Sequence, residues 1–200
     1  MTATEVTKHV DFDPNDIQRV AVRKHERLQV VEYDPTWPES FRVISKRIKD
    51  ALGDRVLDVI HVGSTSIPGL PAKNVIDVDV IVTDPSKEEQ YVPDMENAGF
   101  QLLHREPGWF QHRFFACDEP YSNVHCFGPN CPMVIQHQIF REWMMDPNHR
   151  DDFEKYVQIK QEASRATLAA GETGNQYNLR KQPFIRAVLD RAFKTRGLLD

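Results

Sequence analysis

The chain has 200 residues, a formal net charge of −5 and a hydrophobic fraction of 40%. These values are typical of a globular protein, and the acidic balance argues against a broad nucleic-acid-binding surface, which normally has a basic excess. No apolar segment approaches the length of a membrane span, and the first residues lack the apolar core of a signal peptide. Three cysteines without disulfide-framework spacing fit a reducing compartment, so we expect a cytoplasmic protein.

The predicted elements divide the chain into three parts. Residues 1–27 are polar, carry charges of both signs and form an N-terminal arm ahead of the first strand. Residues 28–132 form a mixed α/β core, and residues 133–200 form a C-terminal helical subdomain. The order of helix, two strands, helix, three strands and then helices predicts an α+β fold with a mixed sheet and flanking helices.

Hydrophobic periodicity and turn residues locate the elements within these parts. In the core, helices are predicted over 39–52 and 84–99, and strands over 56–62, 75–82, 100–105, 109–117 and 122–127. In the C-terminal subdomain, helices are predicted over 136–145, over 151–169 and from 178 to the end of the chain.

One segment, residues 61–82, has features that core packing does not explain. It reads HVGSTSIPGLPAKNVIDVDVIV, with two aspartates inside an apolar strand. Asp77 and Asp79 are two residues apart, so they share one face of that strand at a spacing of about 7 Å. Burying two carboxylates on one face is costly unless a cation lies between them, and Mg²⁺ prefers a few carboxylates together with substrate phosphates. The alternative is structural, with one aspartate capping a turn and the other forming a salt bridge.

The Gly-Ser pair in the same segment fits the phosphate side of such a site. Gly63 allows the backbone to approach a phosphate closely, and the Ser64 hydroxyl and free amides can hold its oxygens. For Ser64 and for Ser66, the alternative is a hydrogen bond within the loop itself.

These residues resemble a known family. A Gly-Ser pair followed by DVD on the next strand resembles the DNA-polymerase-β-like nucleotidyltransferases, and HVGSTSIPGLPAKNVIDVDV resembles the GrpB family, also labelled UPF0157. The resemblance extends through VVEYDPTWPESF, FREWM, YVQIK and YNLRKQPFI. It implies a nucleotidyltransferase-like sheet, with Gly63 and Ser64 at a triphosphate and with Asp77 and Asp79 as ligands of Mg²⁺ or Mn²⁺. It also implies that His61 and Lys73 flank the pocket.

The sequence departs from the wider superfamily at one position. Many active members carry a third carboxylate on a later strand, where the strand over 122–127 has His125. A histidine can accept the proton of an acceptor hydroxyl, but it is a poorer Mg²⁺ ligand than a carboxylate. The alternative is a core histidine. A zinc site is disfavoured because its spacing matches no common structural finger; its members would be His125, Cys126, Cys131 and His137.

Three residues of the C-terminal half are predicted phosphate ligands, because a triphosphate needs more positive charge than Lys73 supplies. Lys160 interrupts an apolar helical stripe, and Tyr177 and Lys181 lie one helical turn apart on one face. Arg113, on a strand expected near the site, is a weaker candidate. The alternative for each charge is a solvated surface. No role is predicted for the remaining histidines, which are His9, His25, His104, His112 and His149.

The expected function is that of a Mg²⁺-dependent transferase. It would move a nucleotidyl group from a nucleoside triphosphate, with ATP the expected one, to a small molecule or another protein. Asp77 and Asp79 would carry the metal, and His125 would deprotonate the acceptor. Two alternatives stay open: a non-catalytic nucleotide- or phosphometabolite-binding module, and a biosynthetic transferase or ligase-like enzyme that uses the same pocket. Neither nucleic acid nor a membrane is an expected partner.

Overall fold

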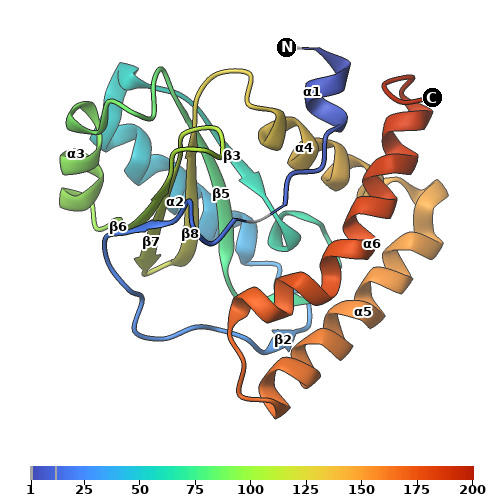
Figure 1. Cartoon of the computed structure of the whole chain (residues 1–200). Helices are drawn as coiled ribbons and strands as arrows, with labels where there is room; N and C mark the ends of the chain where they lie inside the picture. The colour runs from blue at the N-terminus through green and yellow to red at the C-terminus, as the bar shows by residue number, and fades with distance from the viewer. Residues whose placement is uncertain (1, 12) are drawn as a thin grey trace.

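A six-stranded mixed sheet forms the centre of the molecule (Figure 1). The structure is a computed structural model that describes residues 2–11 and 13–200. The sheet order is β1-β6-β7-β8-β5-β3. The strands are β1 (Gln18–Arg19), β3 (Val56–Val62), β5 (Ile76–Val82), β6 (Gln101–Glu106), β7 (His112–Asp118) and β8 (Tyr121–Phe127). Strands β5 and β8 are parallel, and the other neighbouring pairs are antiparallel, which confirms the predicted mixed sheet.

The helices agree with the sequence pattern except for differences at α3, α4 and α6. They are α1 (Ala3–Thr7), α2 (Trp37–Leu52), α3 (Val92–Asn97), α4 (Pro132–Met145), α5 (Arg150–Ala169) and α6 (Gly174–Thr195). The helix predicted over 84–99 is wrong in its first half, where a short 3₁₀ turn precedes α3 and Pro93 lies in the first turn of α3. Proline is tolerated there because its missing N–H has no helical partner. Helices α4 and α6 each begin four residues earlier than predicted, and α6 continues through Pro183.

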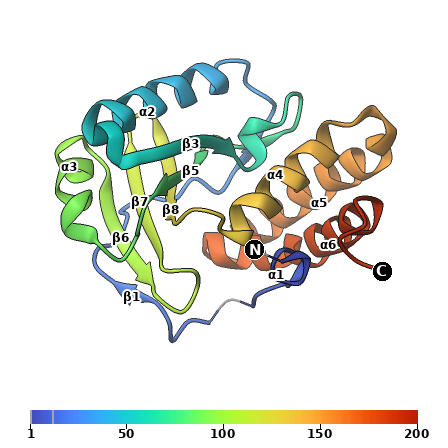
Figure 2. The same cartoon turned by 90° about the horizontal axis from the view of Figure 1, so that it is seen from above.

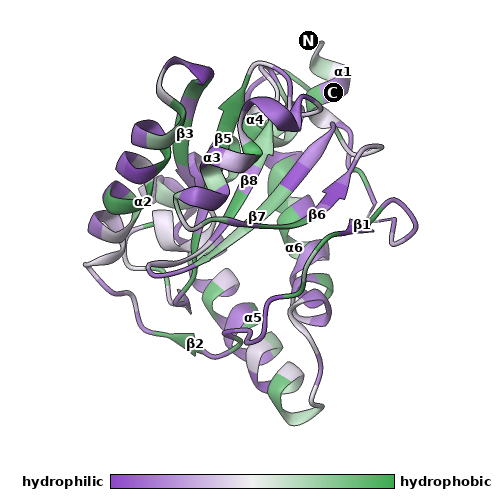
Figure 3. Cartoon of the chain, turned by 90° about the vertical axis from the view of Figure 1, so that its left-hand side faces the viewer, coloured by the Kyte–Doolittle hydropathy of each residue, from purple (hydrophilic) through white to green (hydrophobic). Residues whose placement is uncertain are grey.

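The face of the sheet towards α2 and α3 holds the main hydrophobic core. Alternate β5 residues Val78 and Val80 are fully buried there against Ile44 and Ile48 of α2. Figure 2 shows α2 lying along this side of the sheet, and in Figure 3 the strands β3 and β5 beside it are largely hydrophobic. We call this the α2 face.

The opposite face of the sheet carries polar side chains along its centre. Because side chains alternate along a strand, Asp77 and Asp79 of β5 point away from the α2 face. The parallel register pairs Asp77 with Asn123 and Asp79 with His125 of β8. Helices α4, α5 and α6 pack together beside the sheet, around residues such as Trp143, and form the predicted C-terminal helical part (Figure 2). We call this second side of the sheet the polar face.

The N-terminal arm is more closely attached than its polar sequence predicts. Within the arm, Gln18–Arg19 form the edge strand β1 against β6. Just after the arm, Val30–Val31 form β2, which pairs with β4 (Ala72–Lys73) in a separate two-stranded sheet. Between α1 and β1, the arm crosses in front of the space between the large sheet and α6 (Figure 1). Among the described residues, no helix has both the length and the hydropathy needed to span a bilayer.

Candidate functional site

The loop after β3 fits closely against Asp77. Gly63 has a φ of +66°, a left-handed conformation that L side chains rarely adopt. A Cβ placed on Gly63 would lie 2.5 Å from Oδ2 of Asp77. The Ser66 hydroxyl donates a 2.7 Å hydrogen bond to the carbonyl of Gly63 and so holds the loop in shape. The close contact between the loop and β5 therefore requires a glycine at position 63. Ser66 forms a hydrogen bond within the loop, which is the structural alternative given for it above.

Asp77 is a carboxylate in a polar but poorly solvated position. Burial raises its pKa, while a 2.9 Å hydrogen bond from Nδ2 of Asn123 and the charges of Lys73 and Lys181 lower it in part. The net pKa is raised, so the negative charge on Asp77 is under-compensated by its neighbours. An additional cation at this position would stabilise the charged carboxylate.

Asp79 is fully buried beside the same strand face. Its Oδ2 accepts a 2.7 Å hydrogen bond from Nδ1 of His137, whereas its Oδ1 is buried with no hydrogen-bond partner. Burial lowers the pKa of His137, but the carboxylates of Asp79 and Asp77 outweigh that effect and raise it. A buried carboxylate oxygen without a partner is costly, and a divalent cation would satisfy it. The two aspartates thus fit the predicted metal, as the protein part of a ligand set that Mg²⁺ completes with phosphate oxygens.

Three lysines, the half-buried Lys73 and the buried Lys160 and Lys181, lie close to Asp77. Lys73 comes from β4, Lys160 from α5 and Lys181 from α6, and burial lowers the pKa of each, that of Lys181 to about 7. The ammonium nitrogens of Lys73 and Lys181 lie 4.6 and 4.2 Å from the ring centroid of Tyr177. That of Lys160 lies 5.2 Å from the centroid of Tyr156. Within the described part of the chain, none of the three lysines forms a salt bridge; the lysine that does is Lys46, with Asp50.

Asp77 and Lys181 border a pocket of about 300 Å³ between the sheet and the C-terminal helices, whereas Lys73 and Lys160 lie behind its lining. Its walls include Gly63, Ser64, Asp77, His137, Tyr156 and Lys181. The hydroxyl of Tyr156 lies against the Ser64 side chain. A second pocket of about 490 Å³ also has Lys181 in its wall and extends to Glu106 and Trp109. We refer to them as the loop pocket and the outer pocket.

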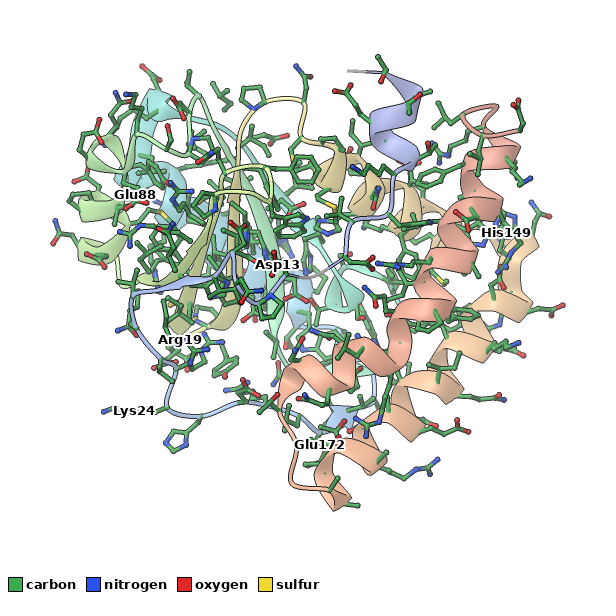
Figure 4. The ribbon with its side chains drawn as sticks, viewed as in Figure 1. Asp13, Arg19, Lys24, Glu88, His149 and Glu172 are labelled. Carbon is green, nitrogen blue, oxygen red and sulfur yellow. The ribbon has the colours of Figure 1, made fainter. Side chains whose placement is uncertain are left out.

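The N-terminal arm borders both pockets. Nε2 of His9 lies 2.7 Å from Oδ1 of Asp190 on α6, and Asp11 is paired with Arg186 of the same helix at 2.6 Å. On the sheet side, Asp16 accepts hydrogen bonds from the backbone amides that follow β6, those of Gly108 and Trp109. In Figure 4 the arm residue Asp13 lies in front of the space between the sheet and α6. The arm therefore connects the two walls of the cleft.

A chain of hydrogen bonds crosses the polar face and fixes the tautomer of His125. Burial raises the pKa of Glu106, but the hydrogen bonds from His104 and His112 outweigh this effect and lower the pKa to about 2. The carboxylate is therefore ionised and can only accept hydrogen bonds. Nδ1 of His112, 2.6 Å away, must then carry the proton, and its Nε2 is free to accept from Nδ1 of His125 at 3.0 Å. Burial lowers the pKa of both histidines and keeps them neutral. The lone pair of His125 is consequently on Nε2.

Two predicted site residues lie on the α2 face instead. His61 stacks on Phe41 of α2 at 4.7 Å, and burial lowers its pKa to about 4. Arg113 is bonded to Glu88 at 2.5 Å, and Glu88 lies on the side of the sheet away from α5 and α6 (Figure 4). Both positions follow from strand alternation, because His61 pairs with Val78 and Arg113 pairs with Cys126. The structure does not bring either residue to the lysines and aspartates.

The structure adds polar residues that the sequence reading missed. His137 contacts Asp79 from α4, Asn123 contacts Asp77 from β8, and His112 and Glu106 contact the His125 network. Strand alternation could have identified Asn123, which is two residues before His125, but no spacing rule connects His137 to a strand 58 positions earlier. The disfavoured zinc set does not form, because Cys126 is buried in the core of the α2 face while His125 is on the polar face.

Comparison with known proteins gives the family. Residues 27–191 match the family described as GrpB protein. The chain belongs to the GrpB family. This GrpB-family chain is 41% identical over 160 residues to a UPF0157 protein of Halalkalibacterium halodurans, a match that covers 80% of this chain and 81% of the relative. It is 35% identical over 162 residues to a UPF0157 protein of Streptomyces coelicolor, with 80% and 82% covered.

Two further similarities concern structure and domain context. The crystal structure of the conserved protein GrpB from Enterococcus faecalis superimposes with a TM-score of 0.70 at 26% identity, over 84% of this chain and 99% of that chain. A dephospho-CoA kinase of Mycolicibacterium paratuberculosis is 30% identical over 211 residues, which cover 92% of this GrpB-family chain but only 50% of the kinase. The family match begins at residue 27, so the crossing part of the N-terminal arm lies outside it.

Proposed function

We propose that this GrpB-family protein binds a nucleoside triphosphate with Mg²⁺ in the loop pocket and transfers the nucleotidyl group to an acceptor. The observation that carries the proposal is the group formed by the half-buried Lys73 and the buried Lys160 and Lys181, with Asp77 as the nearby carboxylate. Burying several cations without matching anions is unfavourable in the free protein, and a triphosphate supplies the missing negative charge.

The positions of the other groups suit the same ligand. The Gly63 loop and Ser64 offer a close approach and a hydroxyl in the wall of the loop pocket, which Lys181 also lines. Asp77 and Asp79 would hold the metal, which when bound offsets charge on the phosphate oxygens and on the leaving pyrophosphate. Asn123 and His137 orient the two carboxylates through the hydrogen bonds at their Oδ1 and Oδ2 atoms respectively.

His125 is the proposed general base. It is the cross-strand neighbour of Asp79, and its Nε2 carries the free lone pair. In the reaction, an acceptor hydroxyl oxygen would bond to the α-phosphorus as the bond to pyrophosphate breaks, and the hydroxyl proton would pass to Nε2 of His125. Because the pKa of His125 is far below its ordinary value, this nitrogen is already unprotonated at neutral pH.

A nucleotide-binding module without catalysis is the second candidate. It is favoured by the hydrogen bond from His137 to Asp79, which occupies one carboxylate oxygen, and by the positions of Asn123 and His125 where a third carboxylate would complete an acidic set. A biosynthetic transferase or ligase-like enzyme is a third candidate, and the match to half of a dephospho-CoA kinase makes coenzyme A precursors reasonable test acceptors.

Turnover of ATP labelled on its α-phosphate separates these candidates. The protein is incubated with labelled ATP, Mg²⁺ and fractionated small-molecule extracts, and labelled products are separated by chromatography. Transferase activity predicts a labelled product that is lost in Asp77→Asn and reduced about 10²- to 10⁴-fold in His125→Ala, with ATP binding retained in the latter. Tight Mg²⁺-dependent ATP binding with no labelled product in any fraction would establish the binding module instead.

A further inference from the structure

The polar face has a second group of metal-binding side chains, at its β6–β7 end. His104 and Glu106 are two residues apart on β6 and share a face. Glu106 is the cross-strand partner of His112 on the neighbouring strand β7. Oε2 of Glu106 lies 3.4 Å from Nε2 of His104 and 2.6 Å from Nδ1 of His112. Over residues 2–11 and 13–200, this is the one set of three such residues whose ligand atoms all lie within 4.8 Å of one another. We propose that His104, Glu106 and His112 bind Zn²⁺.

The donor set matches the chemistry of zinc. Two imidazoles and one carboxylate are a common three-residue zinc set, which leaves a fourth position open. Zinc–nitrogen and zinc–oxygen bonds near 2 Å place neighbouring ligand atoms of a tetrahedral site about 3.3 Å apart. The separation of His104 and Glu106 already has this value, and the shorter one between His112 and Glu106 is a hydrogen bond. Zinc would replace the proton on Nδ1 of His112, and these two atoms would separate by less than about 1 Å.

The surroundings hold the three side chains in place. His112, which is 1% exposed, packs against both Trp109 and Phe127, with its ring centroid 4.8 Å from each of theirs. The His104 ring stacks on Phe114 at 4.8 Å. The second nitrogen of His112 contacts His125 at 3.0 Å, and an outer hydrogen bond of this kind is usual for metal-bound histidines.

Access to this group comes from two sides. The His104 side chain is 26% exposed, and Glu106 forms part of the wall of the outer pocket. A Zn²⁺ ion can therefore enter from solvent, and its fourth position can face the outer pocket. The group, on β6 and β7, is separate from Asp77 and Asp79, which belong to β5 on the other side of β8 in the sheet order.

Zinc at this position would change the state of His125. In the metal-free protein, His112 accepts the proton of Nδ1 of His125, so Nε2 of His125 has the lone pair. A metal on Nδ1 of neutral His112 requires the single ring proton to move from Nδ1 to Nε2, which must then donate to Nδ1 of His125. Neutral His125 would in turn carry its proton on Nε2. Zinc would thus convert the outer nitrogen of His125 from an acceptor to a donor, and only the effect of this change on turnover rests on the proposed function.

The test is a calorimetric titration of the chelator-treated full chain with Zn²⁺. One equivalent should bind, and Co²⁺ in its place should give the visible absorption bands of a tetrahedral site. His104→Ala and Glu106→Gln should each weaken binding about 100-fold or more, whereas Asp79→Asn and His149→Ala should leave it unchanged. His104 is chosen because it is partly exposed, so its loss leaves the fold intact. Wild-type affinity in both His104→Ala and Glu106→Gln would overturn the proposal, as would the absence of binding by the wild type.

Nitrogen-15 NMR of the histidine side chains reports which ring nitrogen of His125 is protonated. This tautomer would not respond to zinc if His104, Glu106 and His112 had only a structural role. Zinc should shift the protonated nitrogen of His125 from Nδ1 to Nε2, and the shift should be absent in His104→Ala at the same zinc concentration. This measurement needs no nucleotide and no turnover, so it holds or fails independently of the nucleotidyltransferase proposal. An unchanged His125 tautomer in zinc-saturated protein would contradict coordination through Nδ1 of His112.

Discussion

Gly63 and Asp77 are in such close contact that a Cβ on the glycine would lie 2.5 Å from the carboxylate oxygen of the aspartate. This contact connects the loop that would hold phosphate to the carboxylate that would hold metal. A change at Gly63 therefore displaces both halves of the site at once.

Gly63→Ala should abolish ATP binding, because the new methyl group must push Asp77 or the loop aside. Gly69→Ala is the matched control, since Gly69 also has a positive φ, +78°, but nothing lies within 4 Å of its Cβ position. Backbone strain alone costs about 1–3 kcal/mol at either position. Thermal unfolding should show a larger loss for Gly63→Ala, and ATP titration should show binding only in the control. Equal ATP affinity in the two variants would place the phosphate elsewhere.

Lys160→Met should stabilise the free protein and weaken ATP binding. Lys160 is 1% exposed, and burial lowers its pKa far below the ordinary value, so an apolar side chain of similar length removes a desolvation cost. A gain of about 1 kcal/mol corresponds to a melting temperature about 2–4 °C higher. Lys155→Met, exposed on the same helix, is the control and should change neither quantity. A destabilised Lys160→Met with normal ATP affinity would show that the lysine serves the fold.

ATP affinity should fall as the pH rises above about 7. Burial lowers the pKa of Lys181 to about 7, with Lys73 adding to the effect and Asp77 opposing it. Below that value Lys181 is already charged in the free protein; above it, binding must take up a proton, which costs about a factor of ten in affinity per pH unit. Titrations across neutral and mildly alkaline pH measure this slope. An affinity that increases over this range would have the wrong sign for a lysine ligand.

Arg113→Gln should destabilise the protein without changing ATP affinity. Arg113 is bonded to Glu88 on the α2 face, and Glu88 keeps a second partner in Arg105. We expect a loss of about 1–3 kcal/mol, since a charged hydrogen bond is removed but Glu88 is not left alone. Denaturant unfolding measures the loss, and ATP titration provides the comparison. Weaker ATP binding by folded Arg113→Gln would show that Arg113 contributes to the ATP site.

The sequence predicted the mixed sheet and most of its strands because period-two apolar runs and Gly-Pro turns specify them locally. Strand β3 has the predicted bounds, and the shared face of Asp77 and Asp79 follows from their spacing. The partners of these aspartates were not predictable in the same way. His137 approaches Asp79 through the packing of α4 on the sheet, a tertiary relationship with no local signal. The predictions for Arg113 and His61 relied on their strands lying near the site. They did not take into account the alternation of side chains along a strand, which places both residues on the α2 face.

The predictions for Lys73, Lys160 and Lys181 differ in origin from those for the strands. Each lysine comes from a different element, and the sequence reading grouped them only through the charge that a triphosphate requires. The structure brings all three near Asp77, around the rings of Tyr156 and Tyr177. The positive charge that a triphosphate requires thus predicted residues that lie close together in the structure, which hydrophobic periodicity could not do.

Proton uptake on ATP binding tests the central claim most directly. Calorimetric titration of the protein with Mg²⁺-ATP near pH 8, in two buffers with different heats of ionisation, gives the number of protons taken up per ATP bound. If the buried lysines bind the triphosphate, about one proton or more should be taken up, because lysines with lowered pKa values must be charged in the complex. Binding without proton uptake, or no binding of Mg²⁺-ATP at all, would contradict the account.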